Sequence, residues 1–187
     1  MKSIAYFSLF LILSTGASEP LVTDNFEKLD LKALPKNYAI AGKAEIVDVG
    51  GEHAKVLHLT VSNKETAALT VTLDAAKVAG RQVVVNVVGR LPGAFTPDLT
   101  KTWARPRLSI AAKDKAGKQV TGSQPLEPQK EDWQPLTATL AVPKDSTYVT
   151  VTLRSEVDAD FFFDNLTIVL EAAVAGAAAG APAAPAA

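Results

Sequence analysis

The chain has 187 residues, of which 19 are Lys or Arg and 20 are Asp or Glu, so its formal net charge is −1. This balance excludes the basic footprint of a nucleic-acid-binding protein and fits neutral ligands better than polyanions. The chain has no cysteine, which excludes disulfide bonds, thiol catalysis and zinc held by thiolates. We therefore expect a domain that is stabilised by its hydrophobic core alone.

The two ends of the chain differ in composition from the middle. Lys2 precedes an apolar run at residues 4–13, which small residues follow. This pattern predicts a signal peptide at residues 1–17, a secreted or periplasmic location and no membrane span in the mature chain, the alternative being an uncleaved anchor. Residues 171–187 are almost all Ala, Gly and Pro, which predicts a disordered tail. One domain is expected between the two ends, at residues 18–170.

Short segments of alternating apolar and polar residues, separated by turn signals, fill the middle of the chain. This pattern predicts the strands of a β-sandwich. A helical turn ended by Gly80 is predicted at residues 74–80. No predicted helix is long enough to connect parallel strands, so the sheets should be antiparallel. The predicted strands are 22–26, 38–40, 43–49, 55–61, 67–73, 82–90, 105–113, 118–121, 133–142, 147–154 and 158–170.

The last predicted strand carries a carboxylate among apolar residues. Asp164 has the same parity as Phe162, Leu166, Ile168 and Leu170, so alternation places all of them on one face. A buried carboxylate is costly unless it is paired, hydrogen-bonded or bound to a metal. We therefore expect Asp164 to have a specific partner.

Four short motifs stand in a characteristic order along the chain. They are Asn25-Phe26-Glu27, Ala79-Gly80 before a valine-rich strand, Trp133 leading to Val142-Pro143, and Phe163-Asp164-Asn165-Leu166. In this order the chain resembles carbohydrate-binding modules of the galactose-binding-like β-jelly-roll type, over residues 22–170. The resemblance implies an all-β sandwich jelly roll with two antiparallel sheets.

The resemblance also implies a structural calcium ion, with Glu27 and Asp164 as ligands and backbone carbonyls completing the shell. Calcium takes about six to eight oxygen ligands, so two carboxylates cannot suffice by themselves. Asn165 stands where such modules often have a second Asp, which removes one charge. The alternative is that Asp164 accepts hydrogen bonds from backbone amides where the first and last strands meet.

A sugar site needs an aromatic face for the ring and polar groups for the hydroxyls. Trp103 is the aromatic candidate because it lies near the end of a long loop at residues 91–104, beside Arg105 and Arg107. The alternative is that the Trp103 ring seals the rim of the sandwich. Trp133 stands where the resemblance implies a packed, structural tryptophan. The polar positions of neighbouring strands add candidates that could share one face, or else form an ordinary solvated surface: Asn86, Arg90, Arg107, Tyr148 and Arg154.

Catalytic motifs are absent from the sequence. His53 lies in a glycine-rich turn and His58 at an outward strand position, and neither has the setting of a catalytic base. We therefore predict a secreted, non-catalytic module that binds a glycan or polysaccharide on a strand face and the 91–104 loop. The alternative is a structural or protein-interaction domain that docks another secreted protein, and a hydrolase on the same fold ranks third.

Overall fold

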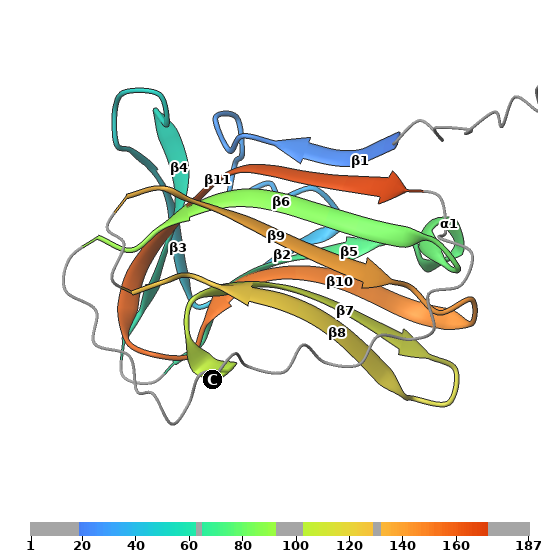
Figure 1. Ribbon diagram of the computed structural model, residues 1–187. Helices are drawn as coiled ribbons and strands as arrows, with labels where there is room; N and C mark the ends of the chain where they lie inside the picture. Colours follow the sequence, from blue (N-terminus) through green and yellow to red (C-terminus); the bar gives the residue numbers. More distant parts are fainter. Residues whose placement is uncertain (1–18, 63–64, 93–102, 129–131, 172–187) are drawn as a thin grey trace, which may run out of the picture.

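Two β-sheets pack face to face in the computed structural model of the chain, which describes residues 19–62, 65–92, 103–128 and 132–171 (Figure 1). All the pairings between neighbouring strands are antiparallel. The prediction of an all-β sandwich with two antiparallel sheets is thus confirmed. Within the described ranges, no helix has the length and apolar character needed to cross a bilayer.

The strands divide between a first and a second sheet. The order in the first sheet is β3 (Lys43–Asp48), β4 (Lys55–Val61), β11 (Ala159–Glu171), β6 (Gln82–Arg90) and β9 (Gln134–Ala141), and β1 (Glu19–Asp24) also pairs with β11. The order in the second sheet is β2 (Tyr38–Ala41), β5 (Ala67–Leu73), β10 (Ser146–Ser155), β7 (Arg107–Asp114) and β8 (Gln119–Pro125).

The core lies between the two sheets and is built by strand alternation. On β10 the inward side chains are Val149, Val151 and Leu153, and they belong to one buried cluster with inward residues of the first sheet such as Val85 and Ile168. Each such side chain contributes about 1.5–3 kcal/mol by leaving water. The opposite parity of β10 therefore faces outward.

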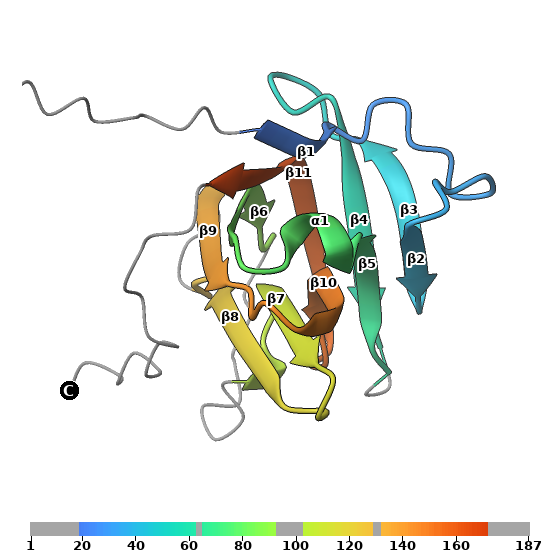
Figure 2. The ribbon, with the colours of Figure 1, turned by 90° about the vertical axis from the view of Figure 1, so that its right-hand side faces the viewer.

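The short helix α1 (Ala75–Val78) is the predicted helical turn, and it lies at one end of the sandwich (Figure 2). The side chain of Asp74 caps it by accepting a hydrogen bond from the amide of Ala76 at 3.0 Å. Gly80 follows with φ 74°, a left-handed conformation that glycine adopts without steric penalty. Val78 is fully buried and anchors the helix to the core.

The first strand ends in a tight turn that buries Phe26. Asp24 accepts hydrogen bonds from the Phe26 amide at 2.7 Å and from the Tyr38 hydroxyl at 3.1 Å. Burial and the nearby Asp24 carboxylate raise the pKa of Tyr38 well above its ordinary value. Phe26 has φ 59°, so it lies in the turn and not in the strand that the sequence predicts to continue through it.

A β-bulge in β11 changes which of its side chains face the core. The pairing of β11 with β6 shifts between Asp164 and Thr167, and Asn165 has φ 54°. As a result, the buried apolar residues of β11 have odd numbers before the bulge and even numbers after it: Phe161, Phe163, Leu166, Ile168 and Leu170.

The bulge corrects the predicted position of Phe162. Phe162 does not share the inward face with Leu166, because strict alternation takes no account of an extra residue. Its ring is half-buried on the outer side of the sheet and stacks on His58, with 4.6 Å between ring centroids.

Three predicted segments lie wholly or mostly outside the described residues. They are the signal peptide at 1–17, residues 172–187 of the predicted tail, and most of the 91–104 loop. The last strand was predicted at residues 158–170, and β11 ends one residue later because Glu171 still pairs with Gln82.

Gly122 lies where β8 approaches β9 at an edge between the two sheets. A Cβ atom built on Gly122 would lie 2.7 Å from the backbone oxygen of Thr139. This oxygen belongs to a paired strand and cannot turn away as a flexible side chain would. A larger residue at position 122 must therefore push β8 away from β9.

We predict that Gly122→Ala lowers the free energy of unfolding by about 1–3 kcal/mol, as overpacking does elsewhere. The matched control is Ser123→Ala, which changes the exposed next residue of β8 and should shift stability by no more than about 0.5 kcal/mol. Urea unfolding followed by tryptophan fluorescence measures both. Equal midpoints for the two variants would contradict the packing argument.

Candidate functional site

A groove with a volume of about 660 Å³ runs over the outer face of the second sheet. It crosses β10, β7 and β8, which lie side by side (Figure 1). The described side chains that face outward along it are Arg107, Ser109, Ala111 and Lys113 from β7, Gln119, Thr121 and Ser123 from β8, and Tyr148, Thr150, Thr152 and Arg154 from β10.

The floor of the groove consists of small side chains in register. Thr152 lies opposite Ser109, which in turn lies opposite Ser123 on the next strand. A second row across the same strands runs from Thr150 through Ala111 to Thr121, and Thr150 is only 6% exposed. Small residues in the middle of the face leave a depression that is lined with hydroxyl groups.

Longer side chains stand at the two ends of this floor. Arg154 lies opposite Arg107 at one end, and Tyr148 lies opposite Lys113 at the other. The stretch of β7 between Arg107 and Lys113 spans roughly 20 Å at the rise of an antiparallel strand. Tyr148 is 49% exposed, so its ring presents an apolar face to solvent.

Two arginines and a carboxylate lie at one end of the groove. Arg107 is 8% exposed, and its Nε donates a hydrogen bond to the backbone oxygen of Arg105 at 3.0 Å. Burial and, to a smaller extent, the charge of Arg154 lower the pKa of Arg107 to about 10, although Glu156 acts in the opposite direction. Arg107 is still protonated at neutral pH. Arg154 pairs with Glu156 at 3.1 Å.

The structure brings together only some of the predicted sugar-binding residues. Arg107, Tyr148 and Arg154 all line the groove. Asn86 and Arg90 lie on β6 in the first sheet, where Asn86 accepts a hydrogen bond from the Thr137 hydroxyl at 2.8 Å. The five residues therefore do not share one face, because alternation shows which face of a strand is polar but not which sheet contains the strand.

Trp103 and Arg105 lie next to the arginine end of the groove. Trp103 belongs to a short 3₁₀ turn, and the following Ala104 oxygen accepts a hydrogen bond from the Glu156 amide at 2.8 Å, which ties this turn to the chain just after β10. Trp103 is 55% exposed, so its ring does not seal the rim of the sandwich. Arg105 is half-buried, and its Nε finds no hydrogen-bond partner among the described residues.

Most of the groove residues do not stand out in the sequence. The alternation of apolar and polar residues does predict that Ser109, Thr150 and Thr152 face outward from their strands. Lys113 has the same parity in the predicted strand 105–113 but was not singled out. The side chains of β8 were missed, because only a fragment of β8 was predicted and its place beside β7 is not visible in the sequence. A longer alternating pattern through residue 125 would have been the signal, but Gly122 weakens it.

Asp164 is buried at 4% exposure, and both of its oxygens have protein partners. Oδ1 accepts a hydrogen bond from the Asn165 amide at 2.7 Å, and Oδ2 lies 2.7 Å from Nδ1 of His53. The ring of His53 in turn packs against Trp133, with 4.2 Å between centroids. Asp164 thus links the bulge of β11 to the turn between β3 and β4, and Trp133 has a packing role.

The proposed calcium ligands do not form a suitable set of donors as they are arranged. Glu27 accepts a hydrogen bond from the Lys55 amide at 3.2 Å, and the oxygens of Asp164 are engaged as described. In the described part of the chain, no three His, Cys, Asp or Glu side chains gather into a potential metal site. Calcium binding by Glu27 and Asp164 stays a prediction, and the contacts of Asp164 fit the alternative of a hydrogen-bonded carboxylate better.

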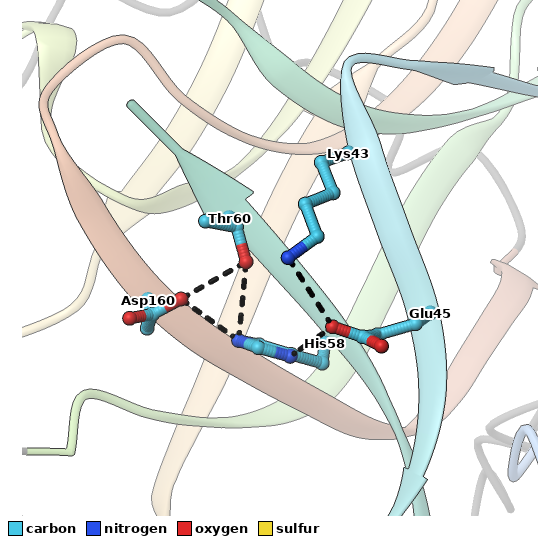
Figure 3. A network of polar contacts seen from close by, with 5 residues as sticks. All are labelled: Lys43, Glu45, His58, Thr60 and Asp160. Carbon is cyan, nitrogen blue, oxygen red and sulfur yellow. Dashed lines mark hydrogen bonds and ion pairs between the residues drawn. The ribbon is translucent and has the colours of Figure 1, made fainter. Parts of the chain in front are cut away.

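A second polar cluster lies on the outer face of the first sheet (Figure 3). His58 on β4 lies between Glu45 on β3, 3.2 Å from its Nδ1, and Asp160 on β11, 3.0 Å from its Nε2. Thr60 also donates a hydrogen bond to Asp160 at 2.9 Å, and Lys43 lies 3.7 Å from Glu45. Because these contacts join three neighbouring strands, we assign the cluster a structural role.

Comparison with known proteins establishes the fold but no family by sequence. No protein-family model and no curated protein matches the chain. Among solved structures, the CBM22-1 xylan-binding domain of Paenibacillus barcinonensis Xyn10C superposes with a TM-score of 0.60 at 15% identity, over 84% of this chain and 98% of that one.

Two further structures show the same fold. One contains the CBM22-1 and GH10 modules of Clostridium thermocellum xylanase 10B in complex with xylohexaose; it has a TM-score of 0.57 and 16% identity, over 80% of this chain but only 28% of that one. The other is a cyclase from Fischerella, with a TM-score of 0.56 and 14% identity, over 84% of this chain and all of that one. The resemblance to jelly-roll carbohydrate-binding modules is therefore confirmed as a likeness of fold.

We predict that Asp164→Asn destabilises the protein by about 1–3 kcal/mol, because a neutral amide cannot form the charge-assisted bond to His53 in a buried site. The matched control is Asp160→Asn, which alters another Asp–His contact on the same strand. The Asp160 side chain is 56% exposed, so its loss should cost less than about 1 kcal/mol. Urea unfolding compares the two variants, and an equal or larger effect of Asp160→Asn would contradict the assignment.

The calcium prediction is tested by thermal melting with calcium and with a chelator. A ligand that binds only the folded state raises the melting temperature. Because the carboxylate oxygens already have protein partners, we expect the two melting temperatures to be the same. A drop of several degrees with the chelator, reversed by calcium but not by magnesium, would show that a structural calcium ion is bound.

Proposed function

We propose that the chain is a secreted, non-catalytic carbohydrate-binding module that holds a soluble glycan in the groove over β10, β7 and β8. The observation that carries the proposal is the groove itself, an elongated polar depression with an exposed aromatic ring at one end. The secreted location depends on the signal peptide predicted at residues 1–17.

The chemistry of the groove suits a sugar chain. Hydroxyl side chains on the floor, such as Ser109 and Thr152, both donate and accept hydrogen bonds, as sugar hydroxyls do. The exposed ring of Tyr148 can cover the apolar face of a sugar unit at one end, and Trp103 lies near the other end. This spacing suits a single chain lying in the groove better than the flat surface of a crystalline polysaccharide.

Similar structures suggest which glycan to test first. Two of them are described as a xylan-binding domain and as a xylanase with bound xylohexaose. At such low sequence identity their ligand is only a starting point. We therefore choose soluble xylan and xylohexaose as the first probes, followed by a broader set of glycans.

We predict that Tyr148→Ala weakens glycan binding by about tenfold or more, since an exposed aromatic anchor commonly contributes at least ~1.4 kcal/mol. The matched control is Asn86→Ala, which changes an exposed polar residue of the other sheet and should leave the affinity unchanged. Titration calorimetry with xylohexaose, or affinity electrophoresis in soluble xylan, measures both.

An equal loss of affinity in the two variants would contradict the placement of the site on the second sheet. Absence of binding to every glycan in a broad array would overturn the proposed function. It would then favour the alternative predicted from the sequence, a structural or protein-interaction domain. Cleavage of a polysaccharide by the purified protein would contradict a non-catalytic role.

A further inference from the structure

The rows of small side chains on the groove floor continue beyond the groove onto β5. Thr152, which lies opposite Ser109 on β7, lies opposite Thr70 of β5 on its other side. In the second row, Thr150 lies opposite Thr72 of β5. Neighbouring strands are about 4.8 Å apart, so each row spans roughly 14 Å from β8 to β5. We call Thr70 and Thr72 the β5 threonines.

The β5 threonines face the same side of the sheet as the groove and can be reached from solvent. Directly opposed residues of an antiparallel pair point to the same face, and Val71 between the two threonines points into the core. Thr72 is exposed and Thr70 is half-buried. Ala39 of β2, which lies opposite Thr70, is also exposed and is too small to cover it. The β5 threonines therefore extend the polar floor sideways.

The two long sides of the groove differ. On one side the second sheet ends with β8, whereas on the other side β5 and then β2 follow β10 (Figure 1). A group that leaves the groove over β8 passes beyond this sheet, but a group that leaves it over β10 lies on β5. In the middle of β10, the side chains that face outward are those of Thr150 and Thr152, which are too short to form a wall.

The surface over β5 is polar but uncharged. The outward residues of β5 are Ala68, Thr70 and Thr72. Arg154 lies opposite Ala68, and its charge is already paired with Glu156 at 3.1 Å. A neutral polar group therefore suits this surface better than an acidic one. Because β5 lies roughly 10 Å from β7 in the middle of the groove, even a short branch can reach it.

We propose that the site takes a branched glycan, whose main chain lies in the groove and whose short neutral branch crosses β10 and binds to the β5 threonines. The proposal rests on the proposed function and names its class of ligand. Threonine hydroxyls both donate and accept hydrogen bonds, so they match the hydroxyl groups of a sugar branch. A branch held in this way makes contacts that a linear chain in the groove does not make.

The test compares two neutral oligosaccharides with the same main chain, xylohexaose and xylohexaose that has one arabinose branch on an inner unit. We expect the purified protein to bind the branched form about three- to tenfold more tightly in titration calorimetry, which corresponds to an additional hydrogen bond between neutral groups. If another glycan binds instead of xylohexaose, its linear and branched forms replace this pair.

Replacement of both β5 threonines by valine locates the effect. Thr70→Val combined with Thr72→Val should remove most of the preference for the branched form and leave the affinity for xylohexaose nearly unchanged. Valine shares the branched shape and the strand preference of threonine but has no hydroxyl, so the fold should be kept. The matched control is Thr139→Val at an exposed position of β9 in the first sheet, which should change neither affinity.

The possible failures are distinguishable. Equal affinity for the two forms, or weaker binding of the branched form, would overturn this inference and leave the proposed function intact. A preference that survives the double substitution would also overturn it, since the branch would then bind elsewhere. An equal loss of affinity for both forms in the double variant would show that the main chain lies on β5, which contradicts the inference. Absence of binding by every glycan would overturn the proposed function as well.

Discussion

The pairing of β11 is the interaction on which the rest of the structure depends. This strand pairs with β6 along one side, and with β4 and then β1 along the other, so it connects the two ends of the domain within one sheet. The bulge at Asn165 lies where the pairing partner of β11 changes from β4 to β1. It lets apolar side chains of β11 face the core both before and after the bulge. Asp164 at this bulge is buried against His53, which ties the turn between β3 and β4 to the strand.

The first sheet thus joins the first and last strands of the domain, and the second sheet carries the groove on its outer face. Inward residues of β10 and β7 fill the core, which leaves their alternate positions free to form the groove. Strand pairing places Thr152, Ser109 and Ser123 in one row and Arg154 beside Arg107. The groove therefore requires no special loop geometry, because it follows from small side chains in the middle of a sheet face and long ones at its ends.

Much of the fold could be predicted from local patterns, because alternation and turn residues act over a few positions. The strands at residues 55–61, 67–73 and 82–90 were predicted with the bounds that the structure shows. The bulge was not predicted, since an extra residue leaves no mark in the alternation, and Phe162 was misplaced as a result. The groove itself could not be predicted, because it depends on pairing between distant strands. This pairing brings the candidates Arg107, Tyr148 and Arg154 onto one face and puts Asn86 and Arg90 on the other sheet.

The central claim is that the outer face of the second sheet binds a glycan. Nuclear magnetic resonance spectra of the labelled protein, recorded while xylohexaose is added, test it most directly. We predict that the amide signals that move belong to β7, β8 and β10, with Ser109, Thr121 and Thr152 among them. Shifts confined to β6, β9 and the His58 cluster of the first sheet would contradict the claim.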